Sequence, residues 1–458
     1  MPDNPPAEAP REALVAPELT PDDVSERISA GVFRKGGSLG WVFGFAVSFA
    51  LLMLFLVSIA WLFAKGVGIW GIQIPVAWGF AIISFVWWIG IGHAGTFISA
   101  ILLLLGQDWR QSINRLAEAM TLFAVACAGV FPLLHLGRPQ FFYYILPYPN
   151  TLDLWPQFRS PLVWDFFAVL TYGTVSLLFW YLGLVPDLAT LRDRARGWQK
   201  KVFAVIALGW TGATSQWHHY KAVYLVLAGL ATPLVISVHS IVGLDFAYAL
   251  VPGWHTTVFP PFFVAGAIFS GFAMVATIVV PLRLCLGLRD MITRKHLDNI
   301  GKLMLATGLM VGLGYLSESF FEWYSAESFE RATVADRFAG PTASVFYGLV
   351  AVNLLSIQPL WSRKVRTSPW ALFAISLLVN VGMWLERFLI VVTTLERDYL
   401  SSSWQAFDAT FWDWSTYLGS LGLFFSLLFL FVRILPVVSI HEMRELTAKL
   451  RGKEAGDA

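Results

Sequence analysis

Eight ionisable side chains lie within or at the ends of long apolar stretches, where charge is costly. They are His135, Asp165, His239, Asp245, Glu318, Glu322, Glu386 and Arg387. In hydrocarbon such groups persist mainly where they face the interior of a helix bundle or a watery cavity. Imidazoles and carboxylates can exchange protons with a ligand. A set of them gathered at one depth therefore predicts a site that binds a polar ligand or transfers protons.

The chain that must position these residues has the composition of a membrane protein. Of its 458 residues, 57% are hydrophobic and 14% are charged, whereas soluble domains carry about 25% charged residues. Apolar runs of about 20 residues recur along the chain. They cover 43–64, 75–105, 115–136, 161–184, 221–246, 260–287, 299–324, 341–361, 368–394 and 412–436. We therefore expect an all-α polytopic membrane protein with about ten transmembrane helices.

Two segments outside these runs also carry a prediction. The stretch 197–213 is short and contains Lys200 and Lys201, so we expect a helix lying on the membrane surface. The N-terminal stretch to Gly40 lacks a short apolar core followed by a small-residue cleavage site. It is expected to be a retained soluble arm, and a disordered tail is the alternative.

The distribution of Lys and Arg predicts the orientation of the helices. Alternate connections and the tail 444–453 hold most of the basic residues. These connections contain Arg34, Lys35, Arg110, Arg115, Arg192, Arg194, Arg196, Lys200, Lys201, Arg289, Arg294, Lys295, Arg363, Lys364 and Arg366, and the others contain only Lys65, Arg138, Arg159, Arg331, Arg337 and Arg397. Because cytoplasmic loops are enriched in basic residues, both termini are expected to be cytoplasmic. The eight ionisable residues then fall in the outer half of the membrane, with His93 near its middle.

The cysteines and histidines bear on redox groups. Cys127 and Cys285 both lie in apolar stretches and form no Cys-x-x-Cys pair, so no iron–sulfur cluster is expected in this chain. A bis-histidine haem needs imidazoles on facing helices at matching depth. Of the candidates His93, His135 and His239, no two share a predicted helix. Haem is therefore the less favoured alternative, and no metal site is predicted.

Two residues near the outer surface suit proton transfer. His135 precedes Leu-Gly-Arg138-Pro139, so it could simply interact with the C-terminal dipole of a helix that ends there. It could instead accept a proton from a ligand. Asp165, in the first turn of the next helix, has the same two interpretations. We expect it to face His135, so that the two could take two protons from a hydroquinone.

The remaining ionisable residues allow a structural or a proton-transfer role. Glu318 and Glu322 share a helix face with Tyr315, and Arg387 is their expected cation. Glu386 and Arg387 point about 100° apart and are not expected to pair simply with each other. His239 and Asp245 do not share a helix face. The structural alternative to proton transfer is an internal hydrogen bond for His239 and a solvated helix cap for Asp245. His93 has small neighbours and is equally suited to a structural hydrogen bond.

Three stretches carry a resemblance to a known family. They are 135–150 (HLGRPQFFYYILPYPN), 154–165 (LWPQFRSPLVWD) and 179–194 (FWYLGLVPDLATLRDR), and 237–247 (SVHSIVGLDFA) adds weaker support. Together they resemble the NrfD/polysulfide-reductase membrane subunits, most closely the ActC-type membrane subunits of bacterial alternative complex III. The resemblance covers about residues 40–440. It implies two four-helix bundles, roughly spans 2–5 and 6–9, with spans 1 and 10 at their flanks.

The resemblance also implies a function. It predicts a quinol-oxidising subunit of the bacterial inner membrane, with ubiquinol or menaquinol bound by His135, Asp165, Asp245 and Arg138. Its expected partners are c-type cytochromes, a periplasmic iron–sulfur subunit, a second NrfD-like membrane subunit and the lipid bilayer, not nucleic acid. Proton conduction would involve His93, His239, Glu318, Glu322, Glu386 and Arg387.

The predicted organisation and its rivals follow from this. We expect an N-terminal arm over 1–40, a first half with the quinol site over 41–250, a second half over 251–440 and a cytoplasmic tail over 441–458. A secondary transporter or ion-conducting subunit is the alternative from another class, in which the carboxylates bind a coupling ion. A quinone-reducing subunit, with electron flow reversed, is a third possibility.

Overall fold

The computed structural model describes residues 13–34, 36–145 and 156–457, and within these ranges the regular structure is entirely helical. Ten helical segments of the described chain are long and apolar enough to cross a membrane. They are α2 (Leu39–Lys65), α3 with α4 (Phe80–Leu104), α5 (Asn114–Leu134), α6 (Pro161–Arg194), α8 (Thr214–Ala247), α9 (Phe259–Cys285), α10 (Arg294–Tyr324), α12 with its extension (Ala343–Trp361), α14 with its extension (Pro369–Thr393) and α15 (Phe411–Ile434). The predicted fold class is confirmed.

Shorter helices complete the described chain. They are α1 (Pro21–Phe33), α7 (Gly197–Ile206), α11 (Ser328–Ala339), α13 (Arg363–Arg366) and α16 (Ile440–Asp457), with 3₁₀ turns at Val67–Ile69, Asp108–Ser112, Pro139–Ile145, Pro156–Arg159, Gln358–Trp361 and Ser401–Ser403. Single π-helical turns, Phe97–Ile101, Ala351–Leu355 and Leu389–Thr393, interrupt three spans. Part of the family-like motif, 146–155, lies outside the described residues.

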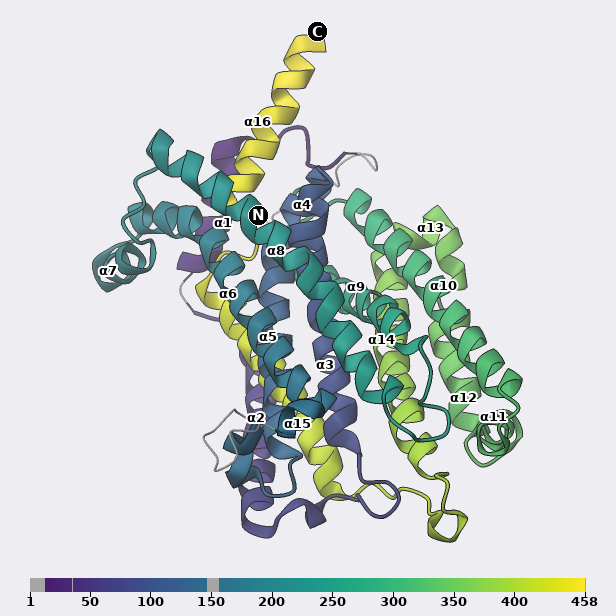
Figure 1. The fold of residues 1–458 in the computed structure, drawn as a ribbon. Coiled ribbons are helices and arrows are strands. Elements are labelled where there is room, and N and C mark those ends of the chain that lie inside the picture. The colour runs from purple at the N-terminus through teal and green to yellow at the C-terminus, as the bar shows by residue number, and fades with distance from the viewer. Residues whose placement is uncertain (1–12, 35, 146–155, 458) are drawn as a thin grey trace.

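The spans pack as two bundles joined by buried helices (Figure 1). In the first, α3 packs on α5, α5 on α6, and α6 on α8; in the second, α9 packs on α10 and α14, and α12 on α14. α3 and α9 contact each other and are the most buried spans. α2 and α15 pair at the flank, and α15 contacts α5 and α3 of the first bundle.

Two ends of the bundle can be told apart. On the terminal side, α1 packs on α16 (Figure 1), and the alternation of the spans places Leu104, Asn114, Arg194 and Thr214 there as well. The opposite, distal side then holds Leu134, Pro161, Ala247 and Tyr324. The sequence-predicted site residues, apart from His93 and His239 deeper in the bundle, lie toward this distal side.

The N-terminal arm is folded over its described part. A capping box of Thr20 and Asp23 starts α1, and Val24 and Ile28 are buried in a cluster that includes Ile440 of α16. Arg27 also pairs with Asp290. The alternative of a disordered tail is therefore wrong for residues 13–34. The predicted surface helix is present as α7, which is not among the spanning segments.

Candidate functional site

An apolar cavity of about 470 Å³ opens at the distal end of the first bundle. The end of α5, the turn after it and the start of α6 form its walls. Its lining residues are Pro132, His135, Leu136, Arg138, Phe141, Tyr144, Ile145, Ser160, Leu162 and Val163. A mainly apolar wall with a few polar groups is the usual composition of a small-molecule site. His135 contributes an imidazole to the cavity and Arg138 contributes a cation, and both residues were predicted from the sequence.

His135 is placed by the end of α5. The helix finishes at Leu134, the backbone N–H of His135 donates to the Phe131 carbonyl, and its Nδ1 lies 3.0 Å from the same oxygen. Gly137 then takes a positive φ of 77° and turns the chain away. Burial lowers the pKa of His135, although the Phe131 and Pro132 carbonyls raise it. A neutral imidazole in this cavity can accept a proton.

Asp165 faces Asp245 rather than the expected His135. The carboxyl group of Asp165 in α6 lies in contact with that of Asp245 in α8, and both residues are buried. Among the described residues, no donor reaches either oxygen of Asp165 or Oδ1 of Asp245. Asp165 is not among the described residues that line the cavity. It lies one helical turn beyond Leu162, which does line the cavity. The carboxyl pair therefore lies about one helical turn deeper along α6 than the cavity lining.

The two glutamates of α10 have a cation that differs from the expected one. Arg337 of α11 places Nη1 2.9 Å from Glu318 and 3.2 Å from Glu322, and all three side chains are buried. Burial lowers the pKa of Arg337, but the two carboxylates raise it by more, so the guanidinium stays charged. The expected pairing with Arg387 is wrong because α11 folds back against α10 at the distal side.

Arg387 instead pairs with its neighbour Glu386, contrary to expectation. The side chains are long enough to meet despite their divergent starting directions, and the guanidinium also lies 4.4 Å from the centre of the Phe263 ring. Tyr315 donates a hydrogen bond to Glu386 and accepts one of 2.8 Å from Asn353. Sequence reasoning missed Asn353, which lies in the middle of the span Ala343–Trp361.

His93 and His239 meet in the middle of the protein. Their ring centres are 4.6 Å apart in an edge-to-face arrangement, and both residues are fully buried. His93 Nδ1 lies 2.7 Å from the Ile89 carbonyl, whereas its Nε2 and both nitrogens of His239 lack a hydrogen-bond partner in the described chain. Rings in direct contact leave no room for a porphyrin between them. The predicted structural hydrogen bond exists for His93 but not among the described contacts of His239.

A polar connection continues from His93 toward the terminal side. Its ring stacks 5.4 Å from that of Tyr172, whose hydroxyl lies 2.7 Å from Thr96 Oγ1. Beyond them, a cavity of about 10 Å³ reaches Glu118, and a volume of this order holds about one water. Its lining residues are Thr96, Ser99, Glu118, Thr121, Ser176, Phe179 and Ala231.

Glu118 belongs to a terminal-side cluster that sequence reasoning missed. Buried Arg115 places Nη1 3.0 Å from Glu118 and Nη2 3.3 Å from Asp187. His441 of α16 lies 3.1 Å from Asp187 through Nδ1, and Tyr220 is 3.0 Å from its Nε2. The sequence signal that could have indicated this cluster is the spacing of Arg115 and Glu118, which are three residues apart and therefore share a helix face.

Comparisons with known proteins agree with this architecture. Residues 68–396 match the family described as Polysulphide reductase, NrfD. A putative membrane subunit of a dimethyl sulfoxide reductase from Halobacterium salinarum is 27% identical over 264 residues, which are 54% of this chain and 55% of the relative. A selenate reductase subunit from Mesobacillus selenatarsenatis is 21% identical over 384 residues, 79% of this chain and 86% of the relative. The match thus spans about half the length of the first relative.

Proposed function

Because the chain belongs to the polysulphide reductase NrfD family, we propose that it is a quinol-oxidising membrane subunit of a multisubunit oxidoreductase. The assembly we propose is of the alternative complex III type, with c-type cytochromes, an iron–sulfur subunit and a second NrfD-like membrane subunit. The observation that carries the proposal is the distal cavity, in which an apolar wall meets His135 and Arg138, with a carboxyl pair one helical turn away along α6.

The side chains of this cavity suit the reaction. Oxidation of a quinol, ubiquinol or menaquinol, to the quinone releases two protons and two electrons. Arg138 can hydrogen-bond one ring oxygen, and neutral His135 can accept the proton of the other hydroxyl. The Asp165–Asp245 pair, one helical turn beyond the cavity residue Leu162, can take up the second proton. The electrons pass to an iron–sulfur cluster of the partner subunit on the distal side.

Proton transfer through the membrane is the second part of the proposal. Buried polar groups lie at successive depths, from Glu318, Glu322 and Arg337, through Glu386 with Arg387 and the His93–His239 pair, to Glu118. The terminal side contains most of the basic connections, so we assign it to the cytoplasm of a bacterial inner membrane. The proposed units are then the arm 1–40, the quinol-binding half 41–250, the second half 251–440 and the tail 441–458.

A second assembly is favoured by the comparisons. Both relatives carry the names of reductase subunits, one of a dimethyl sulfoxide reductase and one of a selenate reductase. Quinol oxidation at the same cavity could therefore supply electrons to a terminal reductase instead of cytochromes. Affinity purification of the tagged chain with mass spectrometry of its companions distinguishes the two assemblies. If the chain purified alone and without colour, the redox proposal would give way to an ion transporter.

The central test is the substitution Asp165→Asn in the purified complex. We expect it to abolish quinol oxidation while the complex still assembles, because the carboxyl pair loses its ability to take up a proton. Asp408→Asn, at an exposed carboxylate on the distal side, is the matched control and should keep the turnover of the parent. Unchanged turnover in assembled Asp165→Asn would remove this carboxylate from the reaction.

A further inference from the structure

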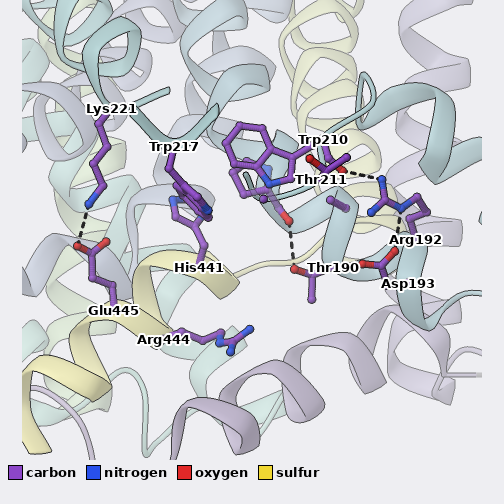
Figure 2. A pocket seen from close by; sticks show the side chains of 13 residues that line it. Thr190, Arg192, Asp193, Trp210, Thr211, Trp217, Lys221, His441, Arg444 and Glu445 are labelled. Atoms are coloured by element: carbon purple, nitrogen blue, oxygen red, sulfur yellow. Dashed lines mark hydrogen bonds and ion pairs between the residues drawn. The ribbon is translucent and has the colours of Figure 1, made fainter. Parts of the chain in front are cut away.

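We propose that a pocket on the terminal side binds the phosphate group of an anionic phospholipid. The pocket has a volume of about 500 Å³ and lies between the end of α6, the connection from α7 to α8, and α16 (Figure 2). It lies at the opposite end of the bundle from the cavity proposed for quinol. The inference is therefore independent of the proposed reaction.

The lining of the pocket has an excess of positive charge. Arg192, Lys221 and Arg444 contribute cations, whereas Asp193 and Glu445 contribute the carboxylates. Three cations and two carboxylates leave a formal charge of +1, before any protonation of His441. Such pockets between transmembrane helices on the cytoplasmic side are suited to anionic lipid headgroups.

Two of these cations are available to a ligand. Arg444 has its nearest carboxylate, Asp22, 3.9 Å away, and about half of its side chain is exposed; in Figure 2 no interaction joins it to the other residues drawn. Lys221 lies 3.3 Å from Glu445, but both side chains are more than 60% exposed. Exposed ion pairs of this kind contribute little stability. A phosphate that contacts Arg444 or Lys221 would displace weak contacts only.

The other side chains give the pocket a fixed shape. Arg192 donates a 2.7 Å hydrogen bond to the Trp210 carbonyl and also contacts Asp193. The ring of Trp217 packs against those of Trp210 and His441, at 4.9 and 5.7 Å between centres. Trp side chains are typical of the membrane–water interface, where their rings lie among headgroups.

The neighbouring helix α7 argues for a lipid over a soluble phosphate ester. Trp198, Val205 and Leu208, in α7 or just after it, are each about 70% exposed, and Lys200 and Lys201 are exposed on the same short helix. A short helix with exposed apolar and basic residues lies in the headgroup region of a bilayer. The pocket beside it therefore opens at the depth at which lipid phosphates lie.

The test is a native mass spectrometry titration of the purified full chain with phosphatidylglycerol and phosphatidylcholine. We expect tighter binding of phosphatidylglycerol, weakened about fivefold by Arg444→Ala and again by Lys221→Ala, at about 1 kcal/mol for each cation. Arg444→Lys should retain binding, and Lys364→Ala, at an exposed cation of α13 outside the pocket, should leave it unchanged. Monodisperse elution of each variant controls for folding.

Two results would overturn the proposal. Equal affinity for both lipids, or parent-like binding by folded Arg444→Ala with Lys221→Ala, would exclude an anionic headgroup at this pocket. Glycerol phosphate is the probe that tests whether the pocket binds a soluble phosphate ester instead of a lipid headgroup. Displacement of phosphatidylglycerol by equimolar glycerol phosphate would assign the pocket to a soluble phosphate ester.

Discussion

Removal of Arg337 should destabilise the protein strongly, because its guanidinium is the shared partner of two buried glutamate side chains. Its Nη1 lies 2.9 Å from Glu318 and 3.2 Å from Glu322, and its Nη2 is 3.4 Å from Thr394 Oγ1. Loss of one partner from a buried ion pair costs about 3–5 kcal/mol. Since Arg337→Met leaves two acids without their cation, we expect a loss near the upper value, about 5 kcal/mol.

The free energy of unfolding, measured in mixed micelles of mild detergent and dodecyl sulfate, checks this prediction. Removing the acids as well, in Arg337→Met/Glu318→Gln/Glu322→Gln, should recover more than half of the loss, because no charge is then left unpaired. Arg331→Met, at an exposed arginine of the same helix, is the control, with an expected change within about 0.5 kcal/mol. A loss below about 1 kcal/mol for Arg337→Met, or no recovery in the triple variant, would refute the ion-pair argument.

Two further predictions concern packing and pH. A Cβ at Gly95 would overlap Thr121 Oγ1, whereas one at Gly129 meets nothing within 4 Å. Gly95→Ala should therefore lower the free energy of unfolding, measured in the same assay, by about 1–3 kcal/mol. A change no larger than that of the control Gly129→Ala would contradict this. Quinol oxidation should fall as the pH drops through the pKa of His135, which burial places below the ordinary value of about 6.5, because the protonated imidazole cannot accept a proton. The pH profile of turnover checks this, and His135→Gln with an unchanged acid limb would assign that limb to another group.

The spans could be predicted from the sequence because membrane insertion makes strong demands on each segment separately. Every one of the ten expected apolar runs overlaps a spanning helix of the described chain. The ends were less predictable: α6 continues to Arg194 and α8 begins at Thr214, each beyond the apolar run. Polar residues in these extra turns pack on α16, and hydropathy carries no information about such contacts.

The partners of the site residues could not be predicted in the same way. Asp165 and Asp245 belong to different helices, and their contact depends on how α6 and α8 are rotated toward each other. From the sequence, Arg337 is only a basic residue of a connection, because the sequence does not show that α11 folds back onto α10. Arg387 contacts Glu386 through side-chain flexibility, which an ideal helical projection ignores.

The arrangement of the polar groups separates the two proposed activities in space. The distal cavity and the pair of Asp165 and Asp245 are built from α5, α6 and α8 of the first bundle. The ion pairs of Arg337 and Arg387 belong to the second bundle and its α11. The pair of His93 and His239 lies between these regions, and the Phe263 ring contacts both His239 and the guanidinium of Arg387. A proton released at the cavity therefore has no need to follow the second-bundle residues, so quinol oxidation and transmembrane proton transfer are separate hypotheses that require separate variants.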